Sequence, residues 1–193
     1  MINQPFAVDV DSVTGVLQPE RGQQIRRLGD LAYLFADPAA AKADPDREVY
    51  RTSTAPGPAI QGHLGLCLTT IRPGCVAGEL HMTHGHVHRR PEGEVYLGLT
   101  GHGGVVLSHD GRVRWLSLGP AQVVVIPPDW IHRSINTGRQ DFVFLSVFPA
   151  LSGTNYEPVR LHGAGARVHG DGSAFRVEDL AGRQVHTGRN PGL

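Results

Sequence analysis

Residues Val105–Leu118 read VVLSHDGRVRWLSL and contain the strongest turn signal of the chain. The pair Asp110-Gly111 separates two runs, Val105–Ser108 and Val113–Leu118. An Asp-Gly pair between two such runs is typical of a two-residue β-hairpin turn. The stretch therefore predicts two antiparallel strands joined by a tight turn.

Further short apolar runs lie on both sides of this hairpin. The chain has 25 glycines and 14 prolines, which separate the runs instead of forming one flexible tract. This pattern is typical of an all-β domain with many turns. The other expected strands are Leu64–Ile71, Glu79–Thr83, Glu94–Leu99, Gln122–Ile126 and Phe142–Phe148. The last two are almost wholly apolar and should lie inside a sandwich or barrel.

The two ends of the chain differ from this middle. One short helix is expected within Leu31–Ala43, with Asp37 as the N-cap and Pro38 at the first helical position. A further hairpin is expected around His169–Gly172, and Gly182–Leu193 has the composition of a loose tail.

Length and composition fit a single domain over residues 1–193, because 193 residues can bury a sizeable core. We expect a barrel core at about 48–160, an N-terminal arm and cap at 1–47, and a C-terminal hairpin and tail at 161–193. Eighteen basic and eighteen acidic residues are scattered, which argues against binding to nucleic acid or membranes. Without a secretory leader pattern or a CxxC pair, Cys67 and Cys75 are expected to be reduced thiols in a cytoplasmic protein.

Residues 83–96, THGHVHRRPEGEVY, include three of the eleven histidines. In a strand, His86 and His88 would present their imidazoles on the same face. In a histidine-rich chain this pair alone is a weak signal, and solvated histidines are the alternative. Glu94 opens a strand that we expect to run antiparallel beside the first, and His132 follows a buried strand. Together the four side chains would form a metal site.

Two motifs carry a resemblance to a known family. HVHRRPEGE, followed after six residues by Gly101, resembles the first cupin motif, and PPDWIHRSIN resembles the second. The words TTIRPG, THGHVH, EVYLGLTGHGG, VVVIPPDWIHRSINTG and FLSVFPA resemble the cupin-type glucose-6-phosphate isomerases of archaea and some bacteria. The resemblance covers Thr69–Tyr156 and implies a single cupin domain. The implied fold is a double-stranded β-helix, or jelly-roll barrel, with one or two short helices near the N-terminus.

The resemblance also assigns roles to individual residues. Four of them would bind one divalent metal ion: His86, His88, Glu94 and His132. Four would line an uncharged phosphate pocket: Thr69, Thr83, Gly85 through its backbone N–H, and Tyr156. Fe(II) is the expected metal, with Mn(II), Zn(II) or Ni(II) as substitutes. Glu94 would be the catalytic base, and Tyr96 would orient the substrate or relay a proton, unless it is a core tyrosine.

The implied reaction interconverts glucose 6-phosphate and fructose 6-phosphate in glycolysis and gluconeogenesis. Proton transfer through an enediolate and a metal-assisted hydride shift would use the same residues. A homodimer is expected, and Met1–Arg21 is long enough to serve as an exchanged arm. The alternatives are another cupin enzyme, either a related sugar-phosphate isomerase or a dioxygenase, and a non-catalytic sugar-binding cupin.

The sequence departs from the family pattern at three positions. Ala121 and Asp129 stand where the pattern has glycine, which indicates altered turns but an intact site. His84 stands where relatives often have lysine. This change weakens the permanent positive charge near the phosphate and predicts a lower or more pH-dependent substrate affinity.

A shorter loop and one more histidine border the motif. Glu94 lies one residue nearer to His88 than in the archaeal relatives. Arg89 and Arg90, in that loop, are expected to be solvated charges, with contact to the substrate phosphate as the alternative. His81, in the preceding strand, is a further candidate to face the site.

Overall fold

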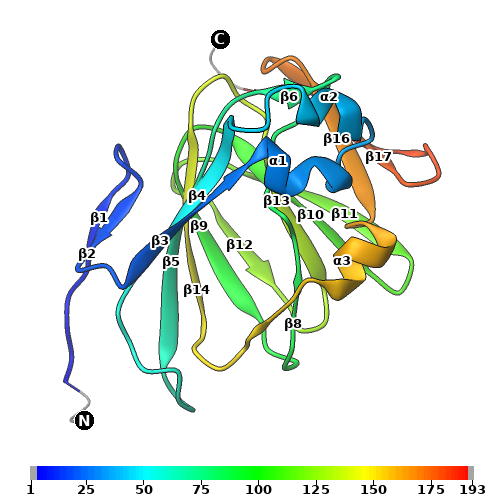
Figure 1. Ribbon diagram of the computed structural model, residues 1–193. Coiled ribbons are helices and arrows are strands. Elements are labelled where there is room, and N and C mark those ends of the chain that lie inside the picture. The colour runs from blue at the N-terminus through cyan, green and yellow to red at the C-terminus, as the bar shows by residue number, and fades with distance from the viewer. Residues whose placement is uncertain (1–3, 191–193) are drawn as a thin grey trace.

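A computed structural model describes residues 4–190 of the chain as a barrel of antiparallel strands (Figure 1). The large sheet has the spatial order β12 (Val123–Ile126), β9 (Glu94–Thr100), β14 (Phe142–Pro149), β5 (Leu64–Ile71), β4 (Glu48–Thr54) and β3 (Gly22–Arg27). Facing it is a sheet with the order β11 (Arg112–Leu118), β10 (Gly103–His109) and β13 (Ile131–Asn136). One core cluster joins side chains of both sheets, among them Phe144 of β14 and Val105 of β10. The architecture confirms the expected all-β cupin barrel.

Smaller sheets complete the fold. A five-stranded sheet has the order β18 (Gln184–Arg189), β17 (Ala174–Asp179), β16 (Ala166–Gly170), β7 (Glu79–Leu80) and β6 (Cys75–Val76). Two pairs remain, β1 (Asp9–Asp11) with β2 (Val16–Gln18), and β8 (Val87–His88) with β15 (Thr154–Asn155). The helical segments are α1 (Leu28–Leu31), the 3-10 turn η1 (Ala32–Leu34), α2 (Pro38–Lys42) and α3 (Glu157–His162). No helix within residues 4–190 is long and apolar enough to cross a membrane.

The predicted hairpin at Asp110-Gly111 is confirmed. Strands β10 and β11 pair from Gly103↔Leu118 to His109↔Arg112. Asp110 and Gly111 both have positive φ, at 47° and 73°. Positive φ at both central residues is the requirement of a type I′ turn, whose twist matches the flanking strands.

The one or two short helices expected near the N-terminus are also confirmed, whereas α3 was not predicted. Asp37 caps α2, because its Oδ1 accepts a hydrogen bond of 2.9 Å from the N–H of Ala40. The segments α1 and η1 precede it, and α3 follows the barrel with Pro158 in its first turn. That proline, a common first-turn residue of helices, was the signal that could have identified α3.

Three expectations about strands are wrong. The strand expected at Glu79–Thr83 is regular only over β7, and beyond it Met82 makes a single bridge to Ile135. Strand β9 pairs with β12 and β14, whereas β8 pairs with β15, so Glu94 does not lie on a strand beside β8. The expected loose tail contains β18, which pairs with β17, and residues 191–193 of that tail lie outside the described range.

A buried ion pair attaches the N-terminal segment to the barrel. Glu79 is 2% exposed, and both of its carboxylate oxygens lie 2.9 Å from Nη1 of Arg167 on β16. The same carboxylate accepts a hydrogen bond of 2.7 Å from the N–H of Ala36, between η1 and α2. The pair therefore fixes the helical cap over one end of the barrel.

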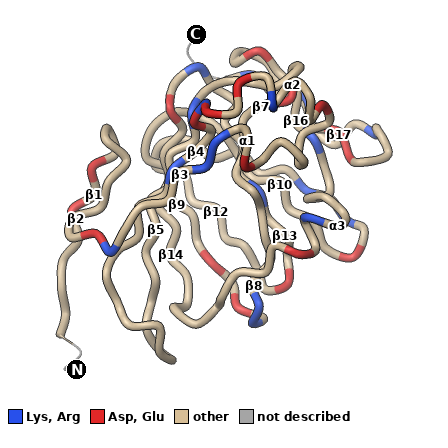
Figure 2. The backbone as a smooth tube through the Cα atoms, viewed as in Figure 1, with Lys and Arg blue, Asp and Glu red and all other residues tan. Residues whose placement is uncertain are grey.

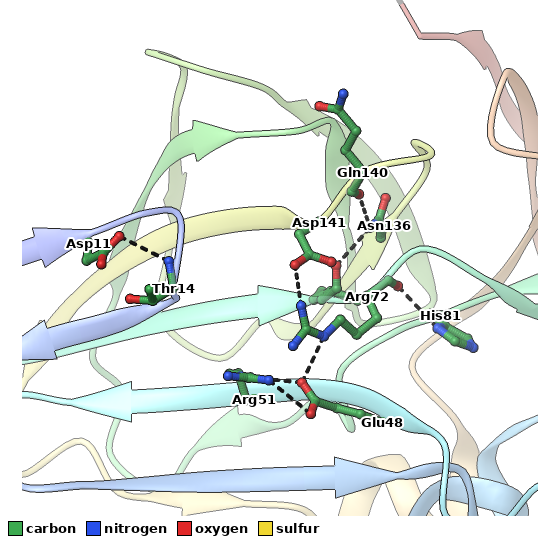
Figure 3. Close-up of polar contacts among 10 residues, drawn as sticks. Asp11, Thr14, Glu48, Arg51, Arg72, His81, Asn136, Gln140 and Asp141 are labelled. Carbon is green, nitrogen blue, oxygen red and sulfur yellow. Dashed lines mark hydrogen bonds and ion pairs between the residues drawn. The ribbon is translucent and has the colours of Figure 1, made fainter.

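Polar side chains close the barrel end where β4, β5 and β14 meet (Figure 3). Arg72 Nε lies 2.9 Å from Glu48 Oε1, and its Nη1 bonds to Asp141. The fully buried Asn136 donates to the carbonyl oxygens of residues 71 and 140, at 2.8 and 2.7 Å. His81 is buried beside this cluster, with Nδ1 3.1 Å from the carbonyl oxygen of Arg72. His81 therefore belongs to the barrel end and does not line the candidate site.

The two positions where the family pattern has glycine both adopt left-handed backbone. Ala121 has a φ of 60° and Asp129 a φ of 68°. Ala121 is the third residue of a turn after Pro120, closed by a bond of 3.1 Å from Gln122 N–H to Gly119 O. Glycine is the usual residue there because a side chain at positive φ crowds the backbone.

Replacing Ala121 by glycine is therefore expected to stabilise the protein by about 1 kcal/mol, after allowing for the entropy of the unfolded chain. The free energy of unfolding from chemical denaturation measures it. Asp129→Gly is the matched comparison and should gain less, because aspartate tolerates this conformation better than alanine does. A destabilised Ala121→Gly variant would contradict the assignment of strain to this turn.

Candidate metal centre and adjoining pocket

Four side chains, three of them buried and that of His86 half-buried, converge on one point of the barrel interior. They are the predicted ligands His86, His88, Glu94 and His132, and one ligand atom of each lies within 4.8 Å of the others. Nε2 of His132 is 2.7 Å from Oε1 of Glu94 and 3.1 Å from Nε2 of His86. The side chains of His88 and Glu94 are 5% and 3% exposed. Water therefore has little access to the four groups.

The backbone brings these residues together from distant parts of the chain. His86 and His132 form an antiparallel bridge, with N–H to O distances of 3.0 and 2.9 Å in the two directions. This bridge holds their rings at a centroid distance of 4.2 Å. Glu94 opens β9 opposite Ile126, the last residue of β12, and His88 ends β8.

Backbone carbonyls fix the orientation of two imidazoles. Nδ1 of His88 lies 2.7 Å from the carbonyl oxygen of Glu92, and Nδ1 of His132 lies 2.9 Å from that of Trp130. A carbonyl only accepts, so each Nδ1 carries the proton and each Nε2 presents a lone pair to the centre. Burial, together with the neighbouring His132 and His88, holds the pKa of His86 well below its usual value. His86 is therefore neutral, as a metal ligand must be.

The residues present fit a divalent metal ion. The lone pair of His132 Nε2 faces a carboxylate oxygen of Glu94 at 2.7 Å, and two acceptors at this distance repel unless a cation or proton lies between them. Three imidazole nitrogens and one carboxylate suit Fe(II), Mn(II), Zn(II) or Ni(II).

A cavity of about 270 Å³ adjoins the four ligands. All the predicted substrate-binding residues line it: Thr69, Thr83, Gly85 and Tyr156. Further hydroxyl groups that the sequence reasoning missed also line it: Thr52, Thr54, Ser134, Ser146, Ser152 and Thr154. Thr52 and Thr54 could have been identified from their spacing, because residues two apart share one face of a strand. Thr52 pairs with Thr69, which was predicted to line the pocket.

Tyr96 also lines the cavity, although it is only 5% exposed. Its hydroxyl donates a hydrogen bond of 3.0 Å to Oε1 of Glu94. Burial, with the nearby charge of Glu94, raises the pKa of Tyr96 well above its usual value. The hydroxyl therefore stays protonated and keeps donating to the carboxylate.

His84 borders the cavity as a neutral ring. Its Nδ1 lies 2.8 Å from the carbonyl oxygen of Gly85, and its Nε2 lies 2.5 Å from the hydroxyl of Tyr33. A protonated Nδ1 and a hydroxyl donating to Nε2 satisfy both contacts without a charge on the ring. Burial lowers the pKa of His84 further. This histidine does not replace the cation that a lysine would supply.

The two arginines of the short loop do not line the cavity. Arg89 and Arg90 are exposed, and Nε of Arg89 donates to the carbonyl oxygen of Thr154 at 3.0 Å. Their positions agree with the expectation of solvated loop charges. Cys67 lines the cavity, and both cysteines are free thiols in the described chain.

Comparison with known proteins places the chain in a family. The family model described as Glucose-6-phosphate isomerase (GPI) matches residues 25–181. A glucose-6-phosphate isomerase of Thermococcus kodakarensis is 35% identical over 91% of this chain and 95% of its own length. One of Sinorhizobium medicae is 36% identical over 94% of this chain and 89% of its own. Among solved structures, an oxalate oxidase in complex with glycolate is 17% identical over 52% of this chain and 49% of that chain, with a TM-score of 0.44.

Proposed function

Because the chain belongs to the glucose-6-phosphate isomerase family, we propose that it interconverts glucose 6-phosphate and fructose 6-phosphate at the four-ligand centre. The observation that carries the proposal is the hydroxyl-lined cavity that adjoins four converging ligand atoms. This reaction is a step of glycolysis and gluconeogenesis. The proposal includes a cytoplasmic location, because two free thiols suit a reducing compartment.

The proposed ligands of one divalent metal ion are His86, His88, Glu94 and His132, with Fe(II) as the first choice. Mn(II), Zn(II) and Ni(II) suit the same donors. When bound, the ion would supply Lewis-acid stabilisation of the negative charge that develops on a sugar oxygen.

The chain's own residues would bind the substrate and move the proton. Thr69, Thr83, Tyr156 and the N–H of Gly85, which line the same cavity as the ligands, would hold the phosphate group. Glu94 would accept the proton from one sugar carbon and return it to the neighbouring carbon. The hydroxyl of Tyr96, bonded to Oε1, would keep this carboxylate oriented during both transfers. The burial of Glu94 would return part of the transferred protons directly to the substrate, while the remainder exchange with water.

A coupled assay tests the proposed function. Freshly purified protein of known metal content is given fructose 6-phosphate, and a dehydrogenase specific for glucose 6-phosphate reports the product. We expect turnover, without oxygen consumption in a parallel electrode measurement. Metal-loaded protein that binds the sugar phosphate without turnover would contradict the proposal, and oxygen uptake would indicate a different cupin enzyme.

We also propose that the protein is a homodimer formed through the outer face of the large sheet. Val125 of β12 pairs with Val95 of β9, which pairs with Val147 of β14, so the three side chains share one face. Val95, Val123 and Val125 are 37%, 57% and 65% exposed. Charged residues gather around the helices and on the β16–β17 side, whereas the long strands of the large sheet carry few (Figure 2). An exposed apolar face of this kind suits a second copy of itself.

The N-terminal arm covers the neighbouring part of the same face. Leu17 of β2 is fully buried, and its N–H bonds to Oγ of Ser53 on β4 at 3.0 Å. The arm thus packs on its own chain, and the proposed dimer uses the sheet face instead of an exchanged arm. Residues 1–3 of the expected arm lie outside the described range.

Size-exclusion chromatography with light scattering should therefore give about twice the 20.8 kDa mass of one chain. Val125→Glu should shift the protein to the mass of one chain, because it places a charge at the most exposed valine of the apolar face. Leu161→Glu is the matched control, since Leu161 is 60% exposed on α3 and lies outside this face. A wild-type mass of a single chain would refute the dimer.

A further inference from the structure

We propose that Arg133 is the positioning cation of the phosphate pocket and that it acts through the peptide bond between His84 and Gly85. This inference rests on the proposed function, in which the N–H of Gly85 binds the substrate phosphate. Arg133 itself does not line the cavity. It packs against the loop residues His84 and Gly85, which do line the cavity.

The hydrogen bonds of Arg133 converge on one carbonyl oxygen. Its Nε and Nη2 donate to the oxygen of His84 at 3.1 and 2.9 Å. That carbonyl and the N–H of Gly85 belong to the same peptide group. Two charge-assisted hydrogen bonds to the oxygen draw electron density away from the nitrogen, which makes the N–H a stronger donor. The positive charge is thereby transmitted to the atom that faces the phosphate.

The loop is packed too closely for this contact to be incidental. Gly85 has a φ of 78°, and a Cβ added to it would lie 3.0 Å from Cβ and 3.1 Å from Nε of Arg133. The residues on either side of Arg133 anchor the loop, because Ser134 exchanges bonds with Thr83, and His132 bridges to His86. Arg133 therefore sits between two fixed points of the strand that supports the phosphate loop.

A phosphate group bound in the cavity would be negatively charged, and a cation packed outside the cavity lining would stabilise it. The described residues that line the cavity include no lysine or arginine, and the two hydrogen bonds of His84 are satisfied by a neutral ring. Arg133 is 3% exposed and forms no ion pair with a carboxylate among residues 4–190. Glu79, the acid that most affects it, is itself paired with Arg167. A guanidinium group keeps its proton at neutral pH, so the charge of Arg133 persists and acts on the carbonyl oxygen of His84 that it contacts.

The test compares two variants that remove the guanidinium but differ in charge. Arg133→Gln is neutral and Arg133→Lys is charged, and each can donate one hydrogen bond to the carbonyl of His84. Isothermal titration calorimetry of metal-loaded protein with inorganic phosphate is the measurement. We expect a Kd about tenfold higher in Arg133→Gln, equivalent to about 1.4 kcal/mol, and within about threefold of wild type in Arg133→Lys.

Metal content and the exposed arginine Arg89 provide the controls. Both variants should keep wild-type metal content, and Arg89→Gln should keep wild-type phosphate affinity. Equal losses of phosphate affinity in the two Arg133 variants, or loss of metal in both, would assign Arg133 a packing role and overturn the inference. So would wild-type affinity in Arg133→Gln. Because this binding is measured without turnover, a failure of the isomerase assay would count separately against the proposed function.

A measurement on the unaltered protein applies if Arg133→Gln does not fold. In the Zn(II)-loaded protein, which is diamagnetic, phosphate is added while the amide resonance of Gly85 and the Nε–H resonance of Arg133 are followed by NMR. Both should shift together with one saturation curve. A shift of Gly85 with a stationary Arg133 resonance, or no shift of Gly85, would overturn the inference.

Discussion

Removing the metal ion with a chelator is expected to lower isomerase activity by about 10³-fold or more, because several kcal/mol of charge stabilisation are lost. The centre consists of three imidazoles and one carboxylate, and the described residues that line the adjoining cavity include no lysine or arginine, so the protein offers no substitute cation at this point. The coupled fructose 6-phosphate assay and metal analysis of the same sample measure the effect. Adding back Fe(II) or Mn(II) should restore the activity.

The choice of added ion provides the control. Mg(II) and Ca(II) prefer sets of oxygen ligands and should restore little activity to a centre of three imidazoles and one carboxylate. A circular dichroism spectrum should show that the chelated protein remains folded. Full activity in verified metal-free protein would refute the metal centre as the catalytic site.

Glu94→Gln is expected to lower kcat by about 10²-fold to 10⁴-fold, the usual loss on removing a general base. Glutamine has nearly the same shape but cannot accept the proton. It also removes the negative charge that faces His132 at 2.7 Å. Because three imidazoles remain, the variant should retain part of its metal, which elemental analysis measures alongside kcat.

Arg89→Ala is the matched control, since Arg89 is exposed near the same loop and lies outside the cavity. Its kcat should be close to that of wild type. Equal losses in the two variants would mean that the roles are misassigned. Reaction of the wild type in D₂O should place deuterium on the transferred position, because a proton held by Glu94 exchanges with solvent. Complete retention of the substrate hydrogen would instead favour a hydride shift.

Much of the barrel was predictable because its strands have local signals. Leu64–Ile71 became β5 with the predicted bounds, and the Asp110-Gly111 turn formed the expected hairpin. The pairing of β8 was not predictable, because it follows from contacts far away along the chain. The N–H groups of Arg89 and Arg90 bond to the oxygen of Ser152, which aligns β8 with β15 and leaves β9 to β12 and β14. The residues of the loop that contains Arg89 and Arg90 show no sequence pattern that would indicate β15 as the partner of β8.

The side chains that could form the site were recognisable from their residue types and spacing alone. Imidazole and carboxylate donors, and the hydroxyls of a phosphate pocket, are properties of residue types at particular places in a motif. Their distances from one another follow from the folded arrangement of the strands. The bridge between His86 and His132 brings nitrogen atoms 46 residues apart in sequence to 3.1 Å, and Arg133 comes to lie behind Gly85 by the same pairing. Each residue type carries its own functional groups, so these can be identified in the sequence. The distances between them depend on the hydrogen-bonded register of strands that are remote in the chain.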